Sequence, residues 1–164
     1  MQPGPKDQRP AEAREDVLVF TTPAFTQDME VTGPVTLELY AKSSAVDTDF
    51  TAKLVDVWPN GFAQNLTEGI LRARYRNSQE MPELLNPQQV YKLIIDLWST
   101  SNIFRSGHRL RLEVSSSNFP RFDRNMNTGR MAAFETRGTA ATNTVFHDRD
   151  HPSALLLPVV EAAP

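Results

Sequence analysis

Residues 35–42 read Val-Thr-Leu-Glu-Leu-Tyr-Ala-Lys, and this stretch decides the fold class. Apolar side chains occupy its odd-numbered positions, and polar or amphipathic side chains occupy its even-numbered positions. Successive side chains of a β-strand point to opposite faces, so a period of two predicts a strand with one buried and one solvent-facing side. Such half-buried strands are typical of antiparallel sheets, because parallel sheets are covered on both faces.

The same strand character recurs from residue 17 onward. Further predicted strands cover Val17–Thr21, Phe50–Trp58, Leu71–Arg76, Tyr91–Trp98, Arg109–Val114, Thr144–His147 and Leu155–Val160. Turn signals separate them, such as Gly33-Pro34 before the quoted stretch and Pro59-Asn60-Gly61 after the next strand. About eight antiparallel strands with turns between them predict an all-β sandwich.

The composition is that of an ordinary soluble domain. The chain has 164 residues, of which 17 are basic and 20 acidic, for a net charge of −3. A negative net charge argues against nucleic acid as a partner. The absence of cysteine excludes disulfides, thiolate metal sites and a cysteine nucleophile. Without an apolar leader or a run of about 20 apolar residues, we expect a cytoplasmic location and no membrane partner.

The first 15 residues differ in composition from the rest. They are polar, rich in proline, and contain too little apolar surface to order themselves. We therefore expect residues 1–15 to form a flexible arm or linker and residues 16–164 to form the sandwich domain. A chain that opens on linker composition is also what a piece of a longer protein looks like.

Nucleophilic catalysis has no motif in this chain. α/β-Hydrolases present their serine within Gly-x-Ser-x-Gly, which the sequence lacks. The serines at 115–117 end a predicted strand and His108 begins one, and nothing places them in a triad with a carboxylate. We assign no catalytic residue and no cofactor-binding residue.

Asp47 and Asp49 are the strongest metal candidates, although the sequence favours another interpretation. Oxygen-rich loop tips bind Ca²⁺, and Asp56 and Asn60 follow these two carboxylates in the sequence. The 12-residue calcium loop with its central glycine and terminal glutamate is absent. The favoured interpretation is a turn in which the aspartates hydrogen-bond the backbone that enters the next strand.

Residues 118–142 form the longest segment without strand character. Segments of this length in a compact domain are usually functional or ordered by a surface on which they pack. The segment is rich in aromatic residues, methionine and arginine, the composition of a protein interface more than of a nucleic-acid site. The candidate docking residues are Phe119, Arg121, Phe122, Asp123, Arg124, Asn125 and Met126.

Several motifs in register resemble one known family. They are Asp47–Val57, Pro59-Asn60-Gly61, Gly69 with Arg72–Arg76, Thr100–Phe104, Gly107-His108-Arg109, Ser115–Gly129, Thr144–His147, His151-Pro152-Ser153 and Leu157-Pro158-Val159. From about Arg14 to Val160, the sequence resembles the C-terminal domain of the X-Pro dipeptidyl-peptidase and cocaine-esterase-like (CocE/NonD) serine hydrolases. Asn60 is a departure, since the family often has aspartate there.

The resemblance implies a jelly-roll β-sandwich related to galactose-binding domains. In this family the catalytic serine, aspartate and histidine belong to an α/β-hydrolase domain that precedes the sandwich, and no position here matches the triad motifs. The implied function is therefore non-catalytic: the domain packs on the hydrolase domain of an esterase or X-Pro dipeptidyl-peptidase and shapes the rim of its active site.

Two further hypotheses stay open at this stage. The chain is alternatively a free-standing module that binds Ca²⁺ at Asp47 and Asp49 or a carbohydrate on Trp58 and Trp98. An uncovered docking face also predicts a homo-oligomer, because exposed apolar patches associate.

Overall fold

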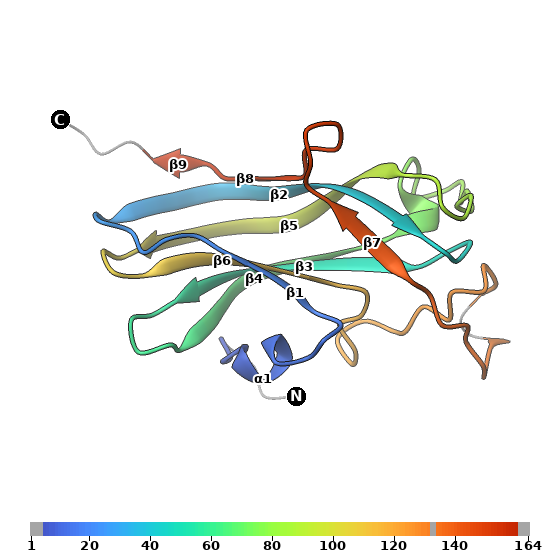
Figure 1. The fold of residues 1–164 in the computed structure, drawn as a ribbon, viewed down its shortest axis with the longest axis horizontal. Helices are drawn as coiled ribbons and strands as arrows, with labels where there is room; N and C mark the ends of the chain where they lie inside the picture. Colours follow the sequence, from blue (N-terminus) through green and yellow to red (C-terminus); the bar gives the residue numbers. More distant parts are fainter. Residues whose placement is uncertain (1–4, 132–133, 161–164) are drawn as a thin grey trace.

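The computed structural model describes residues 5–131 and 134–160, and these residues form two antiparallel sheets packed face to face (Figure 1). The first sheet has the strand order β1 (Leu18–Thr21), β6 (Arg109–Ser115), β3 (Asp49–Val57), β4 (Ala63–Arg72). The second has the order β5 (Tyr91–Phe104), β2 (Met29–Ser43), β7 (Asn143–Phe146), and β8 (Ala154–Leu156) and β9 (Val159–Val160) also pair with β2.

The alternation at residues 35–42 sets the core as predicted. Leu37, Leu39 and Ala41 on β2 are buried, whereas the intervening side chains are partly exposed. The core between the sheets consists of these and other apolar side chains: Val31, Val35, Phe50, Ala52, Leu54, Leu93, Ile95, Leu97, Phe104, Leu110 and Val114. The all-β sandwich of antiparallel strands is confirmed, and the described residues contain nine strands.

Two local predictions are wrong. The predicted strand Leu71–Arg76 is the end of β4, which stops at Arg72 and continues as the 3₁₀ helix η1 (Ala73–Tyr75). The Asp47 carboxylate accepts the backbone N–H of Arg74, so this N–H is not available to a neighbouring strand. Gly33-Pro34 is not a turn either, because β2 runs through it and its register with β5 shifts just after Pro34. Proline lacks the N–H that a regular ladder needs and is tolerated at such an irregularity.

Part of the N-terminal segment contacts the first sheet. Gln8 is buried; its backbone N–H donates to Ala63 O at 2.8 Å, and its side chain accepts a hydrogen bond from Lys53 Nζ at 2.8 Å. The short helix α1 (Arg9–Glu12) follows and lies against the outer face of the first sheet (Figure 1). Polar contacts hold this segment in place, and a composition argument that counts only apolar surface does not detect them.

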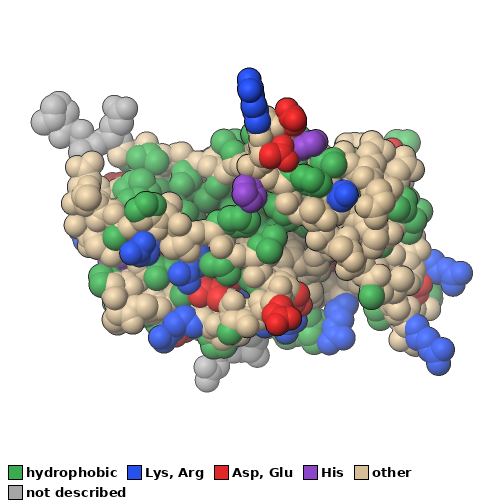
Figure 2. Space-filling view, viewed as in Figure 1, with side chains coloured by type: hydrophobic (Ala, Val, Ile, Leu, Met, Phe, Trp, Pro, Cys, Tyr) green, Lys and Arg blue, Asp and Glu red, His purple; other side chains and the backbone are tan. Residues whose placement is uncertain are grey.

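The two long edges of the sandwich are closed to different degrees. At the β4–β5 edge the backbones nearly touch, since a Cβ on Gly69 would lie 2.0 Å from Asp96 O. At the opposite edge, Leu18 and Phe20 of β1 pair with Val114 and Leu112 but remain 43% and 37% exposed. Figure 2 shows hydrophobic side chains gathered on this side of the molecule, between β8 and β1. One edge of the core is therefore uncovered.

Two carboxyl groups meet where α1 contacts the sheet. Glu113 is buried on β6, with Lys53 Nζ 4.0 Å from one of its oxygens, and Glu12 of α1 forms an ion pair of 2.6 Å with Arg111. Burial, reinforced by the neighbouring Glu12 carboxylate, raises the pKa of Glu113 to about 7. One oxygen of each glutamate has no hydrogen-bond partner among the described residues. In its protonated form Glu113 carries a hydrogen-bond donor beside Glu12 instead of a second buried negative charge.

This arrangement predicts a specific pH dependence of stability. The folded-state pKa of Glu113 lies above the ordinary glutamate value of 4.5 that applies in the unfolded chain. The contribution of Glu113 to stability is therefore fully present below about pH 4.5 and is lost as the pH rises through about 7. The Glu113→Gln variant keeps the uncharged shape and should lose this part of the pH dependence. Urea unfolding midpoints at pH 5 and pH 8 test it; an equal shift with pH in the variant and the wild type contradicts the prediction.

Candidate docking interface

Two buried aspartates hold two arginines at one end of the first sheet. Asp49 accepts hydrogen bonds from Arg72 Nε at 2.9 Å and from Arg72 Nη2 at 3.1 Å. Asp47 accepts from Arg74 Nε at 2.8 Å and from its backbone N–H at 3.0 Å. Both aspartates are almost fully buried, and the Asp49 carboxylate raises the pKa of Arg72. These are charge-assisted pairs with planar guanidinium geometry, the strong class of hydrogen bond.

Asn125 ties the long loop to these aspartates. Its Nδ2 donates to Asp47 Oδ2 and to Asp49 Oδ1, both at 2.8 Å. Asp123 adds an exposed contact of 3.2 Å with Arg72 Nη2, and Arg74 Nη2 donates to Arg130 O at 3.0 Å. The loop is therefore fixed on its inner side by charges that belong to the sheet.

The calcium candidates are engaged by these partners. Every carboxylate oxygen of Asp47 and Asp49 accepts from an arginine or from Asn125, so a cation there would have to displace a guanidinium. Asp56 lies at the other end of β3, where it contacts His108 Nδ1 at 2.9 Å, and Asn60 accepts from the N–H of Phe62. No cluster of three or more potential metal ligands occurs in the part of the chain that the structure describes.

His108 and the serines do not meet. His108 immediately precedes β6, whereas Ser115 is the last residue of that strand and the serines at 116 and 117 follow it. The length of this 7-residue strand separates His108 from the serines, about 20 Å at the usual rise. Burial raises the pKa of Asp56, and the hydrogen bond from His108 opposes that shift. Ser115 Oγ pairs with Thr51 Oγ1 at 2.7 Å, and Ser116 Oγ accepts from Asn143 Nδ2 at 2.7 Å. These groups hold the sandwich together.

The predicted docking residues divide into an inner and an outer set. Asn125 and Met126 are half-buried, and Met126 O accepts the N–H of Thr139 at 2.9 Å. Phe119 is 57% exposed, with the guanidinium of Arg124 4.7 Å from its ring centre. Arg121 and Asp123 are exposed as well, and Phe122 is half-buried. Arg121 pairs with Glu68, and its guanidinium lies 5.6 Å from the centre of the Phe122 ring.

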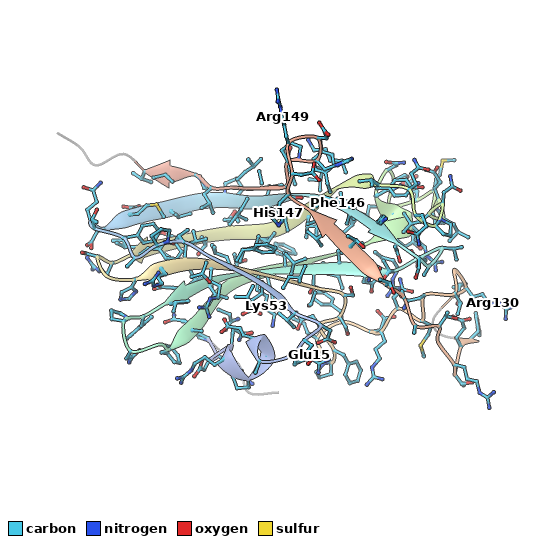
Figure 3. The ribbon with its side chains drawn as sticks, viewed as in Figure 1. Glu15, Lys53, Arg130, Phe146, His147 and Arg149 are labelled. Carbon is cyan, nitrogen blue, oxygen red and sulfur yellow. The ribbon has the colours of Figure 1, made fainter. Side chains whose placement is uncertain are left out.

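A groove of about 1040 Å³ runs beside the outer set. The core residues Phe50, Val114 and Val145 line it together with Phe119 and Arg124 of the loop. Its walls also include the segment that leads into β1 and the start of β7: Arg14, Glu15, Val17, Leu18, Thr142 and Asn143. Figure 3 shows Glu15 and a further lining residue, Lys53, on the side of the sandwich that carries α1. The groove thus reaches apolar core between the loop and the uncovered edge.

Sequence reasoning missed the partners of the loop. Arg72 and Arg74 fall within the predicted strand Leu71–Arg76, and that prediction did not foresee their role in holding Asp47 and Asp49. A signal was present in the spacing, because the two aspartates are two residues apart and so are the two arginines. β3 pairs antiparallel with β4, and this pairing places Asp49 directly opposite Arg72. Opposite charges directly across a ladder attract one another.

No helix among the described residues is long and apolar enough to cross a membrane.

Comparison with known proteins identifies relatives over nearly the whole chain. Residues 3–156 match the family of the X-Pro dipeptidyl-peptidase C-terminal non-catalytic domain. The chain is 48% identical over 160 residues to the cocaine esterase of Rhodococcus sp. (strain MB1 Bresler), covering 96% of this chain and 28% of that enzyme. It thus spans little more than a quarter of that relative's length.

Solved structures agree. An aminopeptidase from a marine sediment archaeon, Thaumarchaeota archaeon, superposes with a TM-score of 0.92 at 32% identity, covering 96% of this chain and 28% of that one. An α-amino acid ester hydrolase superposes with a TM-score of 0.91 at 32% identity, covering 95% of this chain and 27% of that one. The galactose-binding-like relationship stays a prediction, since these comparisons do not test it.

The aspartate–arginine pairs predict a matched result for two aspartates that contact Arg72. Asp49→Ala leaves a largely buried guanidinium without its carboxylate, which should lower the free energy of unfolding by about 3–5 kcal/mol. Asp123→Ala removes only the exposed contact and should change it little. Urea unfolding of the two variants measures the difference. Equal losses would show that the buried pair is not what fixes this end of the sheet.

Proposed function

Since this chain belongs to the C-terminal non-catalytic domains of the X-Pro dipeptidyl-peptidase and CocE/NonD-type serine hydrolases, we propose that it packs on the α/β-hydrolase part of such an enzyme and shapes the rim of its active site. The relatives named above are an esterase, an ester hydrolase and an aminopeptidase. We propose that the parent enzyme likewise cleaves acyl ester or X-Pro peptide bonds, with its catalytic serine outside these residues.

The groove is the observation that carries this proposal. Its lining includes Phe50 and Val114, which elsewhere contact the core, and Leu18, whose side chain is 43% exposed. Burial of apolar area stabilises a protein by about 25 cal/mol per Å², so the exposed apolar side chains at this edge, such as Leu18, favour a covering partner. The relatives are more than three times as long as this chain, and we propose that the rest of such an enzyme is the covering partner.

The loop beside the groove has the chemistry of an interface. Phe119 and Arg124 form an exposed cation–π pair, and aromatic and arginine side chains are enriched among the residues that contribute most to binding. Because Asn125 fixes the loop from its inner side, these exposed side chains are already positioned before contact. A preformed surface loses less conformational entropy on association.

Because the catalytic serine is proposed to lie outside these residues, we expect the isolated chain to have no hydrolase activity. The 164-residue chain should show no turnover of p-nitrophenyl esters or of an X-Pro-nitroanilide, whereas the full-length parent enzyme should hydrolyse at least one class. Serine-type turnover that survives repeated purification of the isolated chain, and that a serine-directed inhibitor abolishes, would show that a triad lies within these residues.

A second experiment tests the docking surface. In the full-length enzyme, Phe119→Ala with Arg124→Ala should lower the temperature at which activity is lost, because both side chains would contact the catalytic part. The same double variant should leave the melting temperature of the isolated chain nearly unchanged, since both side chains are exposed there.

Met81→Ala is the matched control, because Met81 is 76% exposed on another loop and does not line the groove. An equal effect of the double variant on the chain and on the enzyme argues against docking. Light scattering of the isolated chain gives the competing outcome: a stable dimer that the double variant dissociates would assign this face to self-association.

A further inference from the structure

Trp98 combines high exposure with an unusual backbone conformation. Its side chain is 69% exposed, and its φ of 65° lies in the left-handed region that few residues other than glycine adopt. It sits at a β-bulge, since Leu97 and Trp98 of β5 lie opposite the single residue Val35 of β2. Bulges re-aim side chains, and strained backbone persists only where the surroundings enforce it.

Three neighbouring groups enforce this conformation. The backbone N–H of Trp98 donates to Asp96 Oδ1 at 2.7 Å, and the hydroxyl of Thr67 on β4 donates to Leu97 O. Gly69 lets β4 approach, because any side chain there would collide with Asp96 O. Contacts from β4 and β5 thus hold the Trp98 indole toward solvent, although an inward orientation would bury its apolar area.

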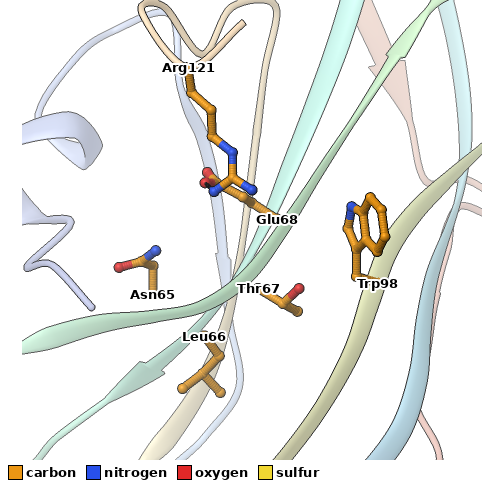
Figure 4. A pocket seen from close by; sticks show the side chains of 6 residues that line it. All are labelled: Asn65, Leu66, Thr67, Glu68, Trp98 and Arg121. Carbon is orange, nitrogen blue, oxygen red and sulfur yellow. Dashed lines mark hydrogen bonds and ion pairs between the residues drawn. The ribbon is translucent and has the colours of Figure 1, made fainter. Parts of the chain in front are cut away.

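The indole borders a hollow that the long loop completes. The hollow has a volume of about 370 Å³ and is lined by Asn65, Leu66, Thr67, Glu68, Trp98 and Arg121. In Figure 4, Trp98 stands on β5 at one side of the hollow and the Arg121 guanidinium lies beside Glu68 at the other. Arg121 belongs to the predicted docking loop, so this loop contributes Arg121 to the hollow and Phe119 and Arg124 to the groove.

We propose that Trp98 is an anchor of the domain interface, whose indole enters an apolar pocket on the catalytic part of the parent enzyme beside the Arg121–Glu68 ion pair. This inference rests on the proposed function and extends it from the groove to the closed β4–β5 edge. Tryptophan and arginine are the residues that most often dominate binding free energy at protein interfaces. The ion pair at the margin can shield the buried indole from water after docking.

The other tryptophan shows what a structural role looks like in the same chain. Trp58 is 41% exposed, packs edge-on against Phe62 with ring centres 5.6 Å apart, and lies 5.5 Å from His108. Its backbone is not among the left-handed residues of the described chain. Trp58 thus stabilises a hairpin end, whereas Trp98 has no such aromatic contact among the described residues.

The Trp98→Gly variant separates an anchor from a structural residue. Glycine adopts a positive φ without strain, so the melting temperature of the isolated chain should stay equal or rise. In the full-length enzyme the same variant should lower the temperature of inactivation, because the anchor is lost. Trp58→Gly should show the reverse pattern, with a lower melting temperature of the isolated chain.

Hydroxyl-radical footprinting locates the contact directly. Trp98 should be oxidised about tenfold more slowly in the full-length enzyme than in the isolated chain, as expected for a fully desolvated anchor. Protection of Phe119 without protection of Trp98 overturns this inference and leaves the proposed function in place. Failure to protect either residue overturns both. A third outcome favours a carbohydrate site: a soluble polysaccharide protects Trp98 from oxidation, whereas the full-length enzyme without polysaccharide does not protect it. This outcome also overturns the inference.

Discussion

Two buried carboxylates at one end of the first sheet, Asp47 and Asp49, impose the constraint on which the rest of the surface depends. Buried charges are costly unless they are paired and hydrogen-bonded, and here two arginines and one asparagine satisfy them. The need for these partners ends β4, bends the chain into η1 and brings Asn125 of the distant loop onto the sheet. Removing one partner would leave an uncompensated charge, so the loop and the sheet end form a single unit.

The two long edges of the sandwich are closed to different degrees, and the fixed loop lies next to the more open one. At the β4–β5 edge, Gly69 allows the two backbones to approach closely. At the other edge, β1 is only 4 residues long, and its apolar side chains Leu18 and Phe20 are partly exposed. A groove lined by core residues lies next to the fixed loop. Rigid polar anchoring on one side and exposed apolar surface on the other are the features that a docking domain needs.

Sequence reasoning predicted the parts of this molecule that follow from local periodicity. The alternation at residues 35–42 places Leu37 and Leu39 in the core because side-chain direction in a strand depends only on parity. It did not predict the ordered segment around Gln8 or the aspartate–arginine pairs, since these depend on side chains brought together from distant positions. The bulge at Trp98 was missed for a related reason. A single extra residue in β5 reverses which side chains face the core, and a contact that supports the bulge comes from Thr67 on β4, distant in the sequence.

The loop and the bulge show how one domain can offer a preformed surface at two places. At the loop, charge pairs on the inner side hold Phe119 and Arg124 outward. At the bulge, Asp96 and Thr67 hold Trp98 in a conformation that it would not adopt alone. In both cases folding of the domain supplies the ordering free energy before any contact is made, so association need not supply it again. Exposed aromatic side chains held by buried polar groups therefore distinguish an interface from a chance apolar patch.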